Sequence, residues 1–321
     1  MDPIYIAYTS LVVMALIPIY VGSLRSEKEK KVESLTSKDA YMFPLYGSCA
    51  LLGLYVVFKL VAAHIVNMLL TCYFVLLATA AVASVVRPVM QRVHVVLAGI
   101  VGVGVAVAYL FTKHWILNNI IGICFALSGV EYLGLSSFKV GAILLCGLFF
   151  YDIFWVFGTE VMVSVATKFD APIKVLFPRN IFDPESKHAM LGLGDIVIPG
   201  IFLALMYRFD CAQSRKRAES TVRKTYFHSC FVAYILGLVV CIGIMQVFKA
   251  AQPALLYLVP ACLGSVLLVA VAKGELSDLM AYEEEKAAEP EGEADLPFMD
   301  QVKKAVRELF LGPAPEKVSK D

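Results

Sequence analysis

Long apolar segments recur along the chain, from its first residues to Gly274. A helix that crosses a bilayer needs about 20 predominantly apolar residues, because each residue advances it by about 1.5 Å. Hydrophobic residues make up 59% of the 321 and charged ones 17%, so a soluble fold would expose a large apolar surface. We therefore predict an all-α polytopic membrane protein with about nine transmembrane helices, at residues 4–24, 41–61, 66–86, 93–112, 116–134, 138–158, 189–207, 227–248 and 252–272.

The basic residues of the connections predict how these helices are oriented. Cytosolic connections of membrane proteins carry an excess of Lys and Arg. Counted together with the span ends that border them, the odd-numbered connections hold 14 of these residues and the even-numbered ones 7, and six of the 14 lie between residues 208 and 226. With nine spans, the N-terminus is expected on the lumenal side and the C-terminus in the cytosol. The net charge of +1 gives no indication of a nucleic-acid partner.

Two regions outside the predicted helices stand out, a strand-like run and an acidic tail. Residues 171–178 read APIKVLFP, a short strand-like run bounded by prolines. Residues 275–321 form an acidic tail after the membrane domain of residues 1–274, and we expect this tail to be cytosolic and largely disordered. Apolar residues between 298 and 310 recur at helical spacing, so an amphipathic helix on the membrane surface is the alternative there.

The cysteine and histidine residues do not indicate a metal site. The eight cysteines fall mostly inside apolar runs and show no CxxC or CxxH spacing. The five histidines lie at span ends or in connections, without the spacing of metal ligands. We therefore interpret the cysteines as small core residues and predict neither a metal nor a cofactor.

Asp152 and Asp195 are the two aspartates that lie inside apolar runs. A carboxylate within a transmembrane helix is energetically expensive and is usually functional. The two residues lie six positions from one end of their respective spans, so on antiparallel helices both are roughly 9 Å inside the same membrane boundary. Two facing carboxylates share one proton, and such a pair can activate a water and protonate a carbonyl. From these residues alone, polar pairing within the bundle or a proton relay in a transporter are the alternatives.

Two motifs near these acids favour close approach of helices. The glycines of GLGD, residues 192–195, allow tight packing and a loosened helix start. QPAL, residues 252–255, lies at the head of the last span on the same membrane side, where proline leaves backbone groups unpaired. Each motif alone is a weak signal, since proline in a first helical turn is common. Asn118 and Asn119 begin another span and are expected to cap or bridge helices.

Taken together, these motifs resemble the signal peptide peptidase family, intramembrane aspartyl proteases related to presenilin. The resemblance covers residues 40–275 and rests on five strings in order: AYMFPLYGSC (40–49), KHWILNN (113–119), FYDIFWVFGT (150–159), AMLGLGDIVIPGIF (189–202) and QPALLYLVPAC (252–262). It implies a presenilin-like bundle with Asp152 and Asp195 as the catalytic dyad. It also implies that the active site is shaped by neighbouring residues, namely Tyr151, Gly192, Leu193, Gly194, Gln252, Pro253, Ala254 and Leu255.

The resemblance further implies substrates, partners and a location. The family cleaves remnant signal peptides and other type II-oriented helices in the endoplasmic reticulum membrane. It also forms homo-oligomers and associates with membrane quality-control machinery, and we expect the same here. The final residues, VSKD, contain no dilysine or KDEL-type signal, so retention in the reticulum rests on the resemblance alone. The presenilin type has the opposite orientation, which the distribution of basic residues disfavours.

Three interpretations of function can be compared on these observations. A proton-coupled carrier would use the same carboxylates but predicts repeated halves with broken helices, and the sequence has no internal repeat. A membrane chaperone or scaffold that had lost the chemistry would not need both Asp152 and Asp195. We therefore predict an intramembrane aspartyl protease.

Ile173, Val175 and Phe177 lie in the strand-like run and are candidates for pairing with a substrate. A peptide bond in a helix is hidden, so a substrate helix has to unwind before cleavage, and its freed backbone groups need new partners in lipid. A strand edge between the two aspartates in the chain could supply those partners. An ordinary lumenal loop is the alternative for this segment.

Overall fold

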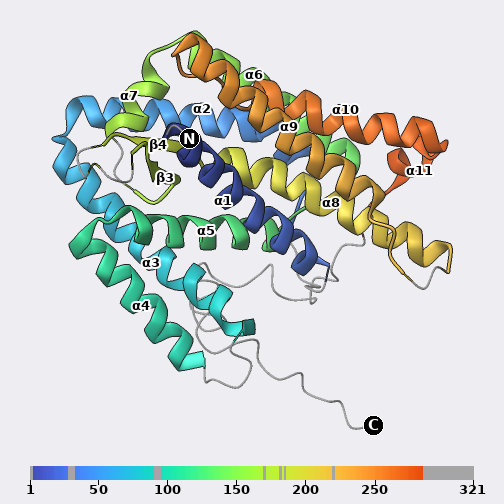
Figure 1. Cartoon of the computed structure of the whole chain (residues 1–321), viewed down its shortest axis with the longest axis horizontal. Helices are drawn as coiled ribbons and strands as arrows, with labels where there is room; N and C mark the ends of the chain where they lie inside the picture. Colours follow the sequence, from blue (N-terminus) through green and yellow to red (C-terminus); the bar gives the residue numbers. More distant parts are fainter. Residues whose placement is uncertain are drawn as a thin grey trace.

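The computed structural model describes residues 3–27, 33–89, 95–168, 171–180, 183, 186–218 and 221–284. Most of these residues are helical (Figure 1). Each of the nine predicted spans contains a helix, namely α1 (Pro3–Ser26), α2 (Ser37–Leu60), α3 (Ala63–Val89), α4 (Val95–Thr112), α5 (Trp115–Tyr132), α6 (Phe138–Phe157), α8 (Gly194–Lys216), α9 (Thr225–Phe248) and α10 (Leu255–Lys273). The predicted all-α polytopic class is confirmed.

The helices differ in how well they suit a membrane span. Among the described residues, seven helices are long and apolar enough to cross a bilayer: α1, α2, α3, α5, α6, α9 and α10. The apolar part of α4 is shorter, and α8 contains charged residues such as Arg208 and Asp210. Seven membrane-capable helices are compatible with nine crossings, and the number nine stays a prediction.

The predicted span at residues 189–207 is wrong at both ends. Residues His188–Gly192 form strand β4, and α8 begins only at Gly194, because the backbone of this segment pairs with another strand. At the other end α8 continues to Lys216, since Arg208 and Asp210 are buried against neighbouring elements and do not terminate it. The last span also begins later than predicted, at Leu255, after Pro253.

The predicted boundary at residue 274 also needs correction. Gly274 adopts a positive φ of 69°, which ends α10 and turns the chain back onto the bundle. Residues Leu276–Ala281 then form the short helix α11, whose Leu279 is fully buried. The first ten residues of the predicted tail are therefore described by the structure, and Leu279 anchors them to the bundle. The remainder of that prediction, including the amphipathic segment at 298–310, lies outside the described residues.

Helix α8 occupies the centre of the bundle. It contacts α1, α5, α6, α9 and α10, and its side chains are buried almost continuously from Ile196 to Cys211 (Figure 1). Close approach to α5 depends on Gly200, where an added Cβ would lie 2.5 Å from a Val130 methyl group. In contrast, α2 buries only Ala40 and Phe58 among its described residues, as expected of a helix that faces lipid.

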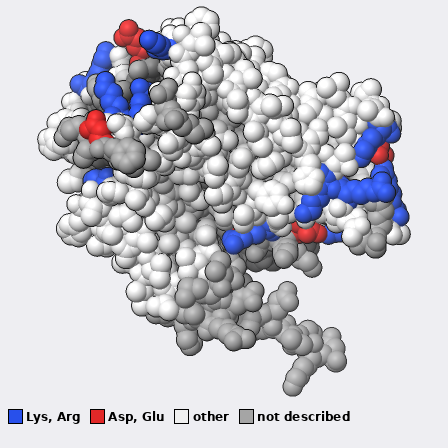
Figure 2. Space-filling view, viewed as in Figure 1, with Lys and Arg blue, Asp and Glu red and all other residues white. Residues whose placement is uncertain are grey.

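The charged surface agrees with a membrane-spanning body. Figure 2 shows Lys and Arg side chains gathered at two opposite ends of the molecule, with a broad uncharged zone between them. One group lies near α7, at the upper left of the view. The other lies at the right, near the ends of α8 and α11. Such a zone is the surface that a bilayer would cover.

Two small sheets connect the helices outside the spans. Strand β1 (Glu33–Leu35) runs parallel to β2 (Leu133–Leu135), which joins the α1–α2 connection to the α5–α6 connection. Strand β3 (Lys174–Pro178) pairs antiparallel with β4, with Val175 opposite Leu191. Within the strand-like run predicted at residues 171–178, residues 174–178 are therefore confirmed as a strand. The short helix α7 (Val161–Lys168) lies between α6 and this sheet in the chain.

Candidate active site

Asp152 lies on α6 and is held by the start of α10. Its Oδ2 accepts a hydrogen bond from the backbone N–H of Leu255 at 2.9 Å, and the side chain is buried, with the residue 5% exposed. Leu255 is the first residue of α10, and the first N–H groups of a helix have no partner within it. The carboxylate thus occupies the positive end of a helix, an arrangement that favours anions. This bond brings two sequence-predicted elements together, the aspartate and the QPAL segment.

Asp195 lies in the first turn of α8 and is partly exposed. Its carboxylate rests against Gly192, where an added Cβ would lie 3.4 Å from Oδ2. The carboxylates of Asp152 and Asp195 are within electrostatic reach of each other, as is the thiol of Cys241 on α9. The two aspartates predicted to form a dyad are therefore in one neighbourhood, where α6, α8 and α10 contact one another.

Leu193, the residue between β4 and α8, joins the sheet to the helix that carries Asp195. Leu193 is buried, and its N–H donates to the carbonyl of Ile173 at 2.9 Å. Its carbonyl accepts the N–H groups of Ile196 and Val197, which begins the helix. Gly194 is exposed, and nothing lies within 4 Å of an added Cβ, so close packing does not require a glycine there.

The remaining predicted residues lie just before the start of α10 or next to Asp152 on α6. Pro253 and Ala254 are buried, and Gln252 accepts a hydrogen bond from the Tyr257 hydroxyl at 3.1 Å. Tyr151 instead faces α2, since an added Cβ at Gly47 would lie 3.5 Å from its ring. Tyr151 thus packs α6 against α2.

Strand β3 is occupied on both of its edges. Its backbone groups at Ile173, Val175 and Phe177 face β4, and these are the three residues predicted to pair with a substrate. On the opposite edge, the Asn118 side chain donates to the carbonyl of Lys174 at 2.7 Å. The Asn119 side chain binds both the N–H and the carbonyl of Leu176, at 2.8 and 2.6 Å. Asn118 and Asn119 therefore bridge α5 to a strand, where a bridge between helices was expected.

The outer edge of β4, the edge that faces away from β3, has free backbone groups. In an antiparallel pair, alternate residues direct their backbone groups to opposite edges. Since Leu191 and Ala189 face β3, the backbone groups of His188, Met190 and Gly192 face away from it, and within the described part of the chain they have no hydrogen-bond partner. A free edge therefore exists in this sheet, but it lies on β4 and leads directly to Asp195.

Two residues of this neighbourhood were not anticipated from the sequence. Tyr234 and Cys241 both lie on α9, where the apolar sequence gives no signal that separates them from core residues. Tyr234 is fully buried, and its hydroxyl donates to the backbone carbonyl of Asp195 at 3.2 Å. Their proximity to the aspartates results from the packing of α9 against α8 and α10.

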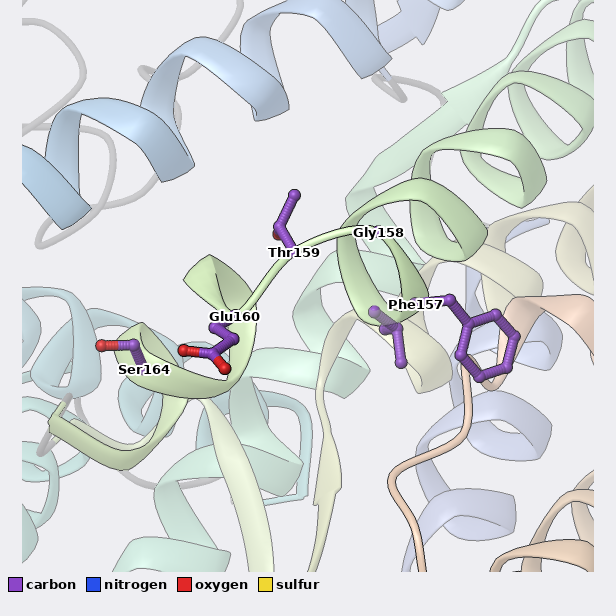
Figure 3. A pocket seen from close by; sticks show the side chains of 6 residues that line it. Phe157, Gly158, Thr159, Glu160 and Ser164 are labelled. Carbon is purple, nitrogen blue, oxygen red and sulfur yellow. The ribbon is translucent and has the colours of Figure 1, made fainter.

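A pocket of about 580 Å³ opens where α6 ends and α7 begins. Figure 3 shows Phe157, Thr159, Glu160 and Ser164 around it. Neither Asp152 nor Asp195 belongs to its lining, so we assign it no part in the chemistry. Within the described residues, no group of three or more His, Cys, Asp and Glu side chains is placed to hold a metal ion.

The fold and the site define a class of protein, a multi-pass helical membrane protein with two carboxylates inside its bundle. Comparison with known proteins specifies the family. The signal peptide peptidase family model matches residues 27–99 and 92–286. The chain is 44% identical to the signal peptide peptidase of Mus musculus, over 92% of this chain and 87% of that protein. It is 43% identical to that of Homo sapiens, over 90% and 86%.

A further relative is the intramembrane protease 2 of Caenorhabditis elegans, which is 53% identical over 58% of this chain and 42% of that protein. The chain therefore belongs to the signal peptide peptidase family and is a multi-pass intramembrane protease. This confirms the resemblance from which the sequence interpretation was made.

Proposed function

We propose that this protein is an aspartyl protease that hydrolyses peptide bonds within transmembrane segments, with Asp152 and Asp195 as its catalytic dyad. The observation that supports this most is the position of the two carboxylates, which lie within electrostatic reach of each other, with Asp152 bound to the N–H of Leu255 at the start of α10. The hydrogen bond from Leu255 orients the Asp152 carboxylate, while Gly192 leaves room for that of Asp195.

Peptide hydrolysis by this dyad requires that one of the two carboxylates is protonated while the other is ionised. The ionised carboxylate removes a proton from a water, and the protonated one donates to the carbonyl oxygen of the scissile bond as the water attacks. The resulting tetrahedral diol then collapses as a proton passes to the leaving amine. This route uses no covalent enzyme intermediate, so the protein has only to position a water and an extended peptide between the two acids.

The dyad is tested with purified protein in detergent and a peptide containing a transmembrane segment. Asp152→Ala and Asp195→Ala should each abolish cleavage, because neither alanine can exchange the proton. Cleavage at the wild-type rate by either aspartate variant would rule out the dyad.

We further propose that the substrates are type II-oriented helices such as remnant signal peptides, cleaved in the endoplasmic reticulum membrane. The names of the mouse and human relatives and the excess of basic residues between 208 and 226 support this proposal. Homo-oligomers and quality-control partners belong to the same proposal.

The proposed orientation places the N-terminus in the lumen and the C-terminus in the cytosol. A glycosylation site engineered into the connection of residues 159–188 should then be modified in microsomes, and one in residues 208–226 should not. The reverse pattern would invert both the protein and the polarity of its substrates.

Substrate pairing is proposed for the outer edge of β4. An unwound substrate needs backbone partners in lipid, and the free groups of His188, Met190 and Gly192 lie in the strand that runs into Asp195. Ile173, Val175 and Phe177 would then act indirectly, by holding β4 in place. A substrate strand added at this edge would end next to the dyad.

A further inference from the structure

The carbonyl oxygen of Asp195 lacks its normal helical partner. In an α-helix the carbonyl of one residue accepts the N–H of the residue four positions later. Four positions after Asp195 is Pro199, which lies inside α8 and has no N–H. In an apolar bundle an unpaired carbonyl is costly, because no water is at hand to bind it. The catalytic helix therefore has a backbone defect at the residue that carries the reacting carboxylate.

Tyr234 binds this carbonyl from α9. Its hydroxyl donates to the oxygen at 3.2 Å, and the Tyr234 side chain is fully buried. The other prolines inside helices give a comparison. Pro18, Pro44 and Pro260 free the carbonyls of Met14, Ala40 and Leu256, and within the described residues no side chain donates to any of the three.

The start of α8 has few other restraints. Its first residues carry no side-chain cap, and the backbone is tied to the sheet through the N–H of Leu193, which donates to Ile173. A second bond, from Tyr234 on α9 to the carbonyl of Asp195, restrains the same short segment of backbone.

We propose that Tyr234 is a positioning residue for Asp195, which binds the carbonyl freed by Pro199 and thereby sets the position of the Asp195 carboxylate relative to Asp152. The proposal rests on the role of Asp195 in the proposed dyad. Tyr234 takes no part in proton transfer, because its hydroxyl is directed at the backbone. It acts on the geometry of the first turn of α8.

The proposal predicts that the effect of Tyr234 depends on Pro199. Tyr234→Phe should lower kcat about 10- to 100-fold with little change in KM, because a small displacement of a catalytic group has a large effect on rate. Pro199→Ala supplies a backbone N–H four residues after Asp195. In that background, Tyr234→Phe should change kcat by only about 2-fold, since the helix satisfies the carbonyl itself.

Tyr226→Phe is a matched control on the same helix. Tyr226 is equally buried, and its hydroxyl donates to Glu275 at 2.9 Å, far along α9 from Tyr234. This variant should leave the kcat of the folded protein unchanged. Affinity for a transition-state analogue provides a second readout that does not require the Pro199 variant to fold: it should fall with kcat in Tyr234→Phe and not in Tyr226→Phe.

The outcomes separate this proposal from that of the dyad. An equal loss in kcat from Tyr234→Phe in both backgrounds would overturn the positioning role. So would unchanged kcat and analogue affinity in Tyr234→Phe, if Asp195→Ala is inactive in the same preparation. Activity in Asp195→Ala would instead overturn the dyad.

Discussion

The two ends of α8 are built in opposite ways. At the Asp195 end the helix has no side-chain cap, and single hydrogen bonds at Leu193 and Asp195 hold it. At the far end, Asp210 accepts the N–H groups of Tyr226 and Phe227 at 3.2 and 2.8 Å and thereby caps α9. Polar bonds are thus sparse at the candidate site and dense away from it.

Residues near this far, C-terminal end of α8 also bind the ends of other helices. Arg208 is buried, donates to the Ser26 hydroxyl of α1 at 2.9 Å, and pairs with Glu284 beyond α11. Arg217 pairs with Glu275, which also accepts a hydrogen bond from Tyr226. The comparison indicates that the bundle is tied at one end of α8, which leaves the other end able to admit a substrate strand.

The largest expected effect comes from replacing an aspartate by asparagine at each end of α8 in turn. Asp195→Asn should reduce cleavage by about 10²- to 10⁴-fold, because an amide cannot take up the proton of the water. Asp210→Asn should leave the activity per folded molecule intact. It should lower the free energy of unfolding by about 1–3 kcal/mol, because the amide cannot accept both N–H groups as strongly as the carboxylate does. Single-turnover rates and denaturant unfolding in detergent measure the two quantities.

The proposed difference between the two ends of α8 would be wrong if activity and stability changed together in either variant. A large loss of activity in folded Asp210→Asn would mean that the far end controls the site. A strong loss of stability in Asp195→Asn would mean that the site end also holds the bundle together.

A smaller effect is expected at the open edge of β4. Met190→Pro removes an N–H that faces away from β3, so the pairing of β3 with β4 should persist. If a substrate strand binds there, this variant should lower kcat/KM roughly tenfold, as expected for one lost hydrogen bond. Met190→Thr keeps the N–H and should cleave like the wild type. Equal rates in the two variants would place substrate recognition elsewhere.

The smallest effect is expected from the pH dependence of the far end. Burial acts to raise the pKa of Glu275, but hydrogen bonds from Arg217 and Tyr226 outweigh it and hold the pKa below its usual value of 4.5. A lowered pKa contributes stability that is present above the usual value and is lost as the pH falls through the lowered one. Between pH 5 and lower pH, the unfolding temperature of Glu275→Gln should therefore fall less than that of the wild type, because the variant lacks this one contribution. Parallel declines in both proteins would exclude Glu275 as the cause.

Local features were predictable where one property of the sequence dominates. Apolar length located the helices within a few residues, since lipid requires about 20 apolar residues whatever the neighbours are. The prolines and β-branched residues of 171–178 predicted β3 correctly. The same criterion misplaced the start of α8, because residues 189–193 are apolar enough for a span but are committed to β4 by pairing with β3.

The chemical composition of the candidate site could also be predicted, because a carboxylate in an apolar helix is rare enough to identify Asp152 and Asp195 without coordinates. Their arrangement could not. The bond from Leu255 to Asp152 joins residues 103 positions apart, and the bond from Tyr234 to Asp195 joins residues 39 apart. Contacts of this kind depend on how helices rotate and approach one another. Such helices are almost equally hydrophobic on all sides, so their sequences do not indicate which side faces which neighbour. Only the tertiary structure shows which buried residues contact the aspartates.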